Sequence, residues 1–216
     1  VKNVLLTMAK ITKEFYPNSI VDDFDKTVKD ISKTSFKKKV EFGKNVLVGK
    51  NVKIGSNTYI SSNSIIESNV SIGKNCVIGS FVTIRSSIIS DDVVIQDGSK
   101  VGVKGFGFIP NPKKNIKSPH IGKVIIENGV EIGANSTVDR GSLSDTVIGQ
   151  NTFIDNQVHI AHNVMIGKNC MIAGQVGFAG STTIGDNVVI GGQAGISGHL
   201  KIGDDVSIGG GSKVIN

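Results

Sequence analysis

When residues 146–215 are aligned in sixes, one position of the repeat always holds a large apolar residue. This position, the apolar column, recurs with a strict period of six. Side chains two apart on a strand point to the same face, whereas an α-helix repeats about every 3.6 residues, so this period predicts short strands and excludes a long helix. Two residues before each member stands a small or aliphatic residue, as at Val158, Val164 and Cys170. The large apolar members between Thr146 and Ile215 are Ile148, Ile154, Ile160, Ile166, Ile172, Phe178, Ile184, Ile190, Ile196, Ile202, Ile208 and Val214.

The period predicts a solenoid over residues 40–215. The pattern runs from Phe42 to Ile84, slips in register near Ser87, and resumes at Ile126. Repetition at a fixed period is typical of chains whose coils stack only on their neighbours, so we expect a parallel β-helix. We expect the chain to turn at the glycines that follow the apolar column, because glycine accepts positive φ. These glycines are Gly149, Gly167, Gly185, Gly191, Gly203 and Gly209.

Two segments do not follow the repeat. Residues 103–122 hold three of the four prolines, and they predict an inserted loop that leaves one corner of the coil. Residues 1–39 are charged and irregular, except for an expected helix from Ala9 to Tyr16 that ends before Pro17. We interpret residues 1–39 as the tail of a truncated N-terminal α/β domain. The chain also stops at Asn216 in register, without the polar cap of a usual solenoid end.

Composition narrows the possible partners and compartments. The net charge of +6 favours an acidic partner, but only 5% of the residues are aromatic and the lysines are scattered, which argues against nucleic acid. No apolar run approaches the roughly 20 residues of a membrane helix, and no secretion signal opens the chain, so we expect a cytoplasmic protein without a transmembrane segment. Cys76 and Cys170 fall in the small apolar column, and we expect both to be reduced core residues.

Six short segments add a specific resemblance to the general repeat. In this order they resemble the UDP-3-O-(3-hydroxyacyl)glucosamine N-acyltransferases of lipid A biosynthesis, a family within the hexapeptide acyltransferases, and the resemblance extends over residues 1–216. It implies an all-β, left-handed, three-sided β-helix of about 18 residues per coil that forms a homotrimer. Handedness rests on the resemblance alone, because the general rule for parallel crossovers predicts a right-handed coil. The segments are Gly105–Phe108, Asp139–Gly141, Ile154–Asn156, Ile160–Asn163, Ala179–Ser181 and Gly198–Leu200.

The resemblance implies transfer of a 3-hydroxyacyl group from acyl carrier protein to the 2-amine of a UDP-linked, 3-O-acylated glucosamine. Forming an amide from a thioester requires a base and a hydrogen-bond donor for the developing oxyanion. The resemblance makes His162 the base. One coil later, Gly180 falls at the same corner, about 5 Å along the axis, where its N–H is the implied oxyanion donor. No cofactor is implied except the phosphopantetheine that enters on the carrier protein, and no metal.

Three further residues receive implied roles. Asp155 and Asn156 precede His162 by seven and six residues, which puts them one corner away in the same coil, within reach only across a trimer interface or around a tight edge. The resemblance makes Asp155 the residue that orients the imidazole and Asn156 a substrate contact. His199 follows His162 by 37 residues, so we expect it about 10 Å along the same edge. The resemblance implies that His199 contacts the phosphopantetheine arm or a substrate phosphate.

The other histidines and the inserted loop have less specific interpretations. His159 alternates with Val158 and Ile160, so it should face outward or toward another subunit. His120, in the inserted loop, receives no role. The larger side chains of that loop cover the acyl chain or touch an acidic carrier, or else they pack against the next subunit. They are Phe106, Phe108, Lys113, Lys114 and Lys117.

Two functions from other classes remain open at this point. A zinc protein like the γ-class carbonic anhydrases would bind its metal between subunits through three histidines, and His159, His162 and His199 are the available set. His159 and His162 point in different directions, from a strand and from a corner, which argues against a shared metal. An inactive trimeric scaffold is the other alternative, because the family's uracil-binding domain and C-terminal helical extension are missing apart from residues 1–39.

Overall fold

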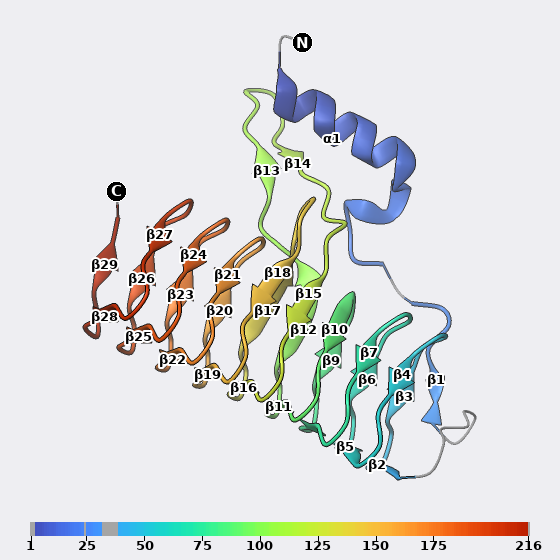
Figure 1. The fold of residues 1–216 in the computed structure, drawn as a ribbon. Coiled ribbons are helices and arrows are strands. Elements are labelled where there is room, and N and C mark those ends of the chain that lie inside the picture. Colours follow the sequence, from blue (N-terminus) through green and yellow to red (C-terminus); the bar gives the residue numbers. More distant parts are fainter. Residues whose placement is uncertain (1–2, 24, 32–38, 216) are drawn as a thin grey trace.

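The repeat forms a left-handed parallel β-helix, as predicted (Figure 1). The computed structural model describes residues 3–23, 25–31 and 39–215. Each regular coil gives one short strand to each of three sheets, and these sheets are the three walls of the solenoid. All strand pairs of the walls are parallel in the described residues, apart from the antiparallel pair of β1 and β3.

The strands of the described residues form three long sheets and one hairpin. The first sheet has ten strands: β1 (Lys29–Asp30), β3 (Leu47–Val48), β6 (Ile65–Ile66), β9 (Thr83–Ile84), β12 (Lys100–Lys104), β17 (Thr137–Arg140), β20 (His159–Ile160), β23 (Gly177–Phe178), β26 (Gly195–Ile196) and β29 (Lys213–Val214). The second has nine: β2 (Val40–Phe42), β5 (Thr58–Ile60), β8 (Val77–Ile78), β11 (Val94–Ile95), β16 (Glu131–Ile132), β19 (Phe153–Ile154), β22 (Met171–Ile172), β25 (Val189–Ile190) and β28 (Ser207–Ile208). The third has eight: β4 (Lys53–Ile54), β7 (Ser71–Ile72), β10 (Ser87–Ile89), β15 (Val124–Ile126), β18 (Thr146–Ile148), β21 (Met165–Ile166), β24 (Thr183–Ile184) and β27 (Lys201–Ile202).

The apolar column of the sequence is the core of the solenoid. Strand pairing stacks its members directly, for example Ile160 on Phe178 on Ile196, and none of these three is more than 3% exposed. Burial of one such side chain contributes about 1.5–3 kcal/mol, so the stack stabilises every coil along the axis. Cys76 and Cys170 lie fully buried in the same core as free thiols, which confirms their prediction as core residues.

The glycines after the apolar column have a different cause from the one predicted. Positive φ occurs instead in a polar column two residues later, at positions such as Asn151, Asn163 and Asn169, and asparagine tolerates this conformation well. A Cβ on Gly149 would lie 2.6 Å from the carbonyl carbon of Gly167 in the next coil. The prediction of positive φ at these six glycines is therefore wrong. At Gly149, Gly167, Gly185 and Gly191 it is close stacking on the next coil, and not the turn, that requires glycine.

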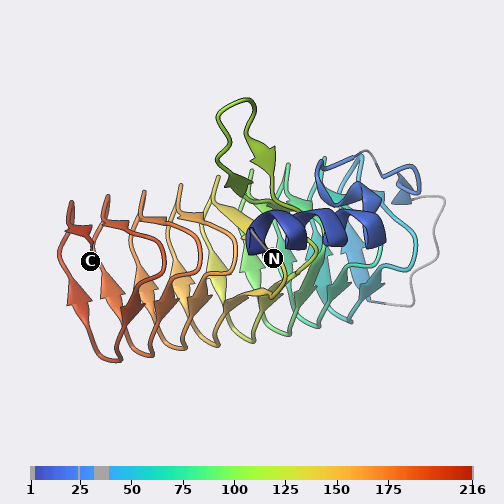
Figure 2. The same cartoon turned by 90° about the horizontal axis from the view of Figure 1, so that it is seen from above.

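The inserted loop leaves the solenoid after β12. That strand continues beside β17 as far as Lys104, and the chain then forms an antiparallel hairpin of β13 (Phe108–Ile109) and β14 (Ile116–Lys117). The hairpin projects from the wall (Figure 2). The register slip predicted near Ser87 coincides with β10, which pairs with β7 on one side and, past the insertion, with β15 on the other.

A helix precedes the solenoid and lies beside the hairpin (Figures 1 and 2). Helix α1 spans Val4–Phe15, starting earlier than the predicted Ala9 because Asn3 caps it by accepting a hydrogen bond from the Leu6 N–H at 3.0 Å. It ends before Pro17, as expected, and a short 3-10 helix η1 (Pro17–Ser19) follows. The interpretation of residues 1–39 as part of a larger domain stays a prediction, and residues 32–38 lie outside the described residues. No helix in the described part of the chain is both long and apolar enough to cross a membrane.

Candidate functional site

His162 and Gly180 meet at one corner of the solenoid. His162 follows β20 and lies where the chain passes from the first sheet to the third, and the Ser181 N–H donates to its carbonyl oxygen at 3.0 Å. A Cβ built on Gly180 would lie 2.8 Å from Nε2 and 2.7 Å from Cε1 of His162. The structure therefore brings together the two residues that the coil spacing paired, with the outer edge of the imidazole against the Gly180 backbone.

Asn163 fixes the tautomer of His162. The Asn163 side-chain nitrogen donates to the Ser144 carbonyl at 2.8 Å, and its Oδ1 accepts from the Ser142 N–H at 3.1 Å, which orients the amide. His162 Nδ1 lies 3.0 Å from the same Oδ1. Since an amide oxygen only accepts, Nδ1 carries the proton and Nε2 of the neutral ring is bare. His162 thus presents a proton acceptor toward Gly180. Asn163 follows His162 in the sequence, but this adjacency alone did not predict the arrangement.

The Gly180 N–H is a free donor beside that acceptor. The neighbouring N–H groups of Ala179 and Ser181 donate to the carbonyls of Ile196 and His162. The Gly180 N–H makes no hydrogen bond to any other residue that the structure describes. A backbone N–H without a partner next to a bare imidazole nitrogen can hold a developing oxyanion.

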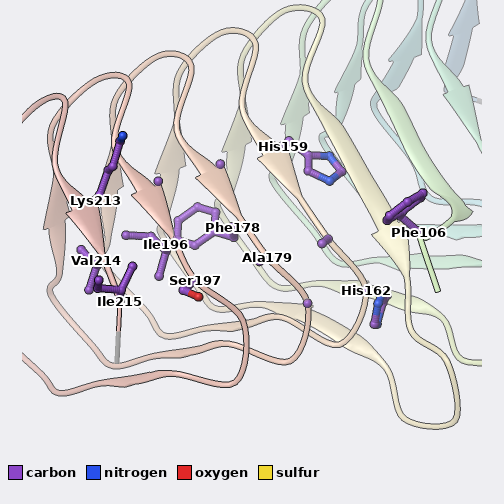
Figure 3. Close-up of a pocket in the computed structure, with 14 residues that line it drawn as sticks. Phe106, His159, His162, Phe178, Ala179, Ile196, Ser197, Lys213, Val214 and Ile215 are labelled. Carbon is purple, nitrogen blue, oxygen red and sulfur yellow. The ribbon is translucent and has the colours of Figure 1, made fainter. Parts of the chain in front are cut away.

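A groove of about 550 Å³ begins at this corner and runs along the outside of the first sheet (Figure 3). Phe106, His159 and His162 lie at one end, and residues 213–215 lie at the other. The outward positions of β23 and β26 are Gly177 and Gly195, and a Cβ at either one would meet nothing within 4 Å. The two glycines therefore keep the outer face of the wall open. Most of the remaining lining is apolar: Ala161, Phe178, Ala179, Ile196, Val214 and Ile215.

His159 faces outward into the same groove, as its alternation predicted. Its Nδ1 lies 2.8 Å from Thr137 Oγ1, and its Nε2 lies 4.0 Å from Asp139 Oδ2. Burial lowers the pKa of His159. Burial, with a smaller contribution from Asp22, raises the pKa of the Asp139 carboxyl to about 7. Asp139 was noted only as part of a motif, and its closeness to His159 follows from the pairing of β17 with β20.

His120 packs against His162 from the inserted loop. Its side chain is 1% exposed, and its ring meets that of His162 edge to face, with centroids 5.1 Å apart. Burial and the nearby His162 lower the pKa of His120 to about 4. The period does not predict this contact, because the loop interrupts the repeat, and His120 had no predicted role.

Asp155 and Asn156 lie at a different corner, between the second and first sheets. Asp155 Oδ1 accepts from the Asn156 N–H at 2.7 Å, and Asn156 Oδ1 accepts from the Ala134 N–H at 2.7 Å. Within this chain the partner of His162 Nδ1 is Asn163. The predicted roles of Asp155 and Asn156 therefore involve a neighbouring chain and stay predictions.

His199 lies on the same edge of the solenoid as His162, further along the axis. It is exposed, takes a φ of 61°, and its N–H donates to the Gly180 carbonyl at 3.1 Å. This is the place that the spacing predicted, whereas its substrate contact stays a prediction. Among the described residues of the single chain, no three His, Cys, Asp or Glu side chains are grouped to hold a metal ion.

Comparisons with known proteins agree on the fold and point to acyl transfer. The profile of the family described as "Bacterial transferase hexapeptide (six repeats)" matches residues 51–86, 145–180 and 181–216, half of the chain. Proteins of Rhizobium rhizogenes and Agrobacterium fabrum, both named UDP-3-O-acylglucosamine N-acyltransferase, are 54% and 49% identical to it over 78 and 79 residues. These matches cover 36% and 37% of this chain, and 22% of each relative's length.

Solved structures of acyltransferases share the architecture. The UDP-N-acetylglucosamine acyltransferase of Campylobacter jejuni superposes with a TM-score of 0.71 at 25% identity, over 80% of this chain and 66% of that one. The UDP-N-acetylglucosamine acyltransferase of Arabidopsis gives a TM-score of 0.70 at 27% identity, over 83% of this chain and 65% of that one.

Proposed function

Because the chain belongs to the bacterial transferase hexapeptide family, we propose that it is an N-acyltransferase of lipid A biosynthesis. It transfers a 3-hydroxyacyl group from acyl carrier protein to the 2-amine of UDP-3-O-(3-hydroxyacyl)glucosamine. The observation that carries this proposal is the bare Nε2 of His162 beside the free N–H of Gly180, at the mouth of an apolar groove. Two relatives are identical to this chain at about half of the matched residues, and both are named N-acyltransferases. Their names support the choice of an amine as the acceptor.

His162 and Gly180 would together carry out the transfer. The amine attacks the thioester carbonyl, and His162 Nε2 takes the proton that the nitrogen loses as the C–N bond forms. The carbonyl oxygen becomes an oxyanion, and the Gly180 N–H donates to it. When the C–S bond breaks, the imidazolium returns its proton to the departing thiolate of the phosphopantetheine arm. Asn163 keeps Nδ1 protonated throughout, so Nε2 alone exchanges the proton.

The groove suits the hydrocarbon part of the donor. It leads away from His162 over Gly177 and Gly195, and its lining is mostly apolar, so an acyl chain would lose contact with water along it. His199 lies on the same edge and remains the proposed contact for the phosphopantetheine arm or a substrate phosphate. The proposal includes no resident cofactor or metal.

Association of three chains would complete the site. The outer face of the second sheet carries a stack of exposed apolar side chains, Phe153, Met171 and Val189, which are 53%, 54% and 37% exposed. Stacked apolar side chains on a surface are typical of an interface. Asp155 and Asn156 adjoin this stack, so in a homotrimer they would reach the corner of a neighbouring chain, where Asp155 would orient the imidazole and Asn156 would contact substrate.

The test is a transfer assay with carrier-bound 3-hydroxyacyl donors and the UDP-linked amine. We expect His162→Ala to lower turnover at least about 100-fold, the scale for losing a general base. Asn187→Ala removes an exposed side chain from another corner and should leave turnover near that of the wild type. Near-normal turnover in His162→Ala would reject this base. A wild type without transfer activity would favour the zinc protein if it carried stoichiometric zinc, and the scaffold if it did not.

A further inference from the structure

His120 is a buried polar residue in a loop most of whose residues are at least partly exposed. Its Nδ1 lies 3.1 Å from the Ser118 carbonyl oxygen, and because a carbonyl only accepts, Nδ1 carries the proton. The opposite nitrogen, Nε2, is buried and has no hydrogen-bond partner among the described residues. A buried acceptor without a partner is unfavourable, so packing of the loop alone does not explain a histidine here.

The loop backbone at Gly105 and Gly107 packs closely against His120 and His162. A Cβ on Gly105 would lie 2.8 Å from Cβ and 2.9 Å from Cδ2 of His162, and 3.1 Å from Nε2 of His120. A Cβ on Gly107 would lie 2.6 Å from Cε1 of His120. Only glycine fits at these two positions without displacement, so the loop is closely packed on both imidazoles.

Contacts on several sides therefore restrict the movement of the His162 ring. Asn163 holds Nδ1, the Gly180 backbone lies against Nε2 and Cε1, and Gly105 lies against the Cβ and Cδ2 edge. The ring of His120 meets the ring of His162 at an interplanar angle of 73°, which limits its tilt.

We propose that His120 is a positioning residue for the base: its ring, packed against that of His162, keeps the imidazole of His162 turned with Nε2 toward Gly180. Histidine suits this place because one ring nitrogen anchors it to Ser118 while the rest of the ring reaches His162. Burial keeps the pKa of His120 near 4, so the ring is neutral near pH 7 and does not repel the imidazolium that His162 forms. The kinetic part of the inference rests on the proposed function.

Two substitutions separate positioning from simple anchoring of the loop. His120→Ala removes both the ring and its hydrogen bond. His120→Asn keeps a side-chain N–H where Nδ1 lies, and so keeps the bond to the Ser118 carbonyl, but it removes the ring edge. We expect both variants to lose about 10- to 100-fold in kcat with little change in KM, because a misplaced base affects the transition state. Turnover at the wild-type level in His120→Asn would overturn the inference.

A second measurement does not depend on activity. The ring signals of His162 and His199 can be followed by NMR in the substrate-free protein, with His162→Ala to assign the first. In His120→Asn the His162 signals should shift or broaden, while those of His199, one coil beyond Gly180 and bonded to its carbonyl, should stay in place. Unchanged His162 signals would contradict the inference, whereas an inactive wild type with shifted signals would reject only the proposed function.

Discussion

Replacing Gly180 with alanine would disturb the corner by the smallest possible amount. The added Cβ would lie 2.8 Å from His162 Nε2, and an ordinary contact needs about 3.5 Å, so the imidazole must move by roughly 0.7 Å. The Gly180 backbone lies outside the left-handed region, so alanine itself is not strained there. The displaced group is a half-buried side chain at the surface, and the effect should fall on chemistry and not on folding.

The size of the effect follows from the displacement. A misplacement of about 1 Å at a reacting group costs about 100-fold in rate. For Gly180→Ala we therefore expect a loss of about 10- to 100-fold in kcat, equal to about 1.4–2.7 kcal/mol in activation free energy. The assay is steady-state transfer from carrier-bound donors at saturating amine.

Asn187→Ala is the control, because it changes an exposed side chain at another corner and leaves the contact between Gly180 and His162 intact. Both variants should melt within about 4 °C of the wild type, since neither removes core packing. If Gly180→Ala turned over as fast as Asn187→Ala, the contact between Gly180 and His162 would have no part in catalysis.

The groove, the buried histidine and the apolar stack each give a further expectation. Gly195→Leu fills open space on the groove wall, so it should slow transfer from a long-chain donor about 10-fold more than from a short-chain one, and equal slowing of both would argue against the groove as the acyl site. His120 has a pKa of about 4 in the folded chain, below its unfolded value of about 6.5. Between these pH values the unfolded state binds more protons than the folded state, so the free energy of unfolding falls as the pH drops through them. Urea unfolding should show that the wild type loses about 2 kcal/mol more than His120→Asn between pH 7.5 and pH 5, and equal losses would refute the depressed pKa. Sedimentation should give about three times the chain mass of 22.7 kDa, and Met171→Glu should dissociate the assembly, whereas a monomeric wild type would contradict the trimer.

The six-residue period was enough to predict a parallel β-helix because it fixes which side chains share a face, whereas the left-handed coil was predicted from the family resemblance alone. Ile160, Phe178 and Ile196 are stacked in the core for the same reason that they share a column. The glycine column was misinterpreted because positive φ and close stacking both favour glycine, and the sequence does not distinguish them. The asparagine at position 151 or 163 was the available signal for the turn.

The site was predictable only where it follows the repeat. One coil separates His162 from Gly180, so counting residues was sufficient to pair them. The contact between His120 and His162 depends on how a non-periodic loop folds back, and no spacing encodes that. The tautomer of His162 depends on the hydrogen bond that Asn163 accepts from the Ser142 N–H and on the one that it donates to the Ser144 carbonyl. Both serines lie in a coil where β15 and β18 pair at an offset of 22 residues instead of 18, so the period does not predict these contacts.

A groove laid along a stack of coils can change its length only in steps. Each coil adds one strand spacing, about 4.8 Å, so gain or loss of a coil would lengthen or shorten the open wall by that increment. Finer adjustment must come from the outward side chains, where Gly177 and Gly195 now leave the wall bare. Substitution at these two positions is therefore the route by which such a solenoid would tune its ligand without altering the stack beneath it.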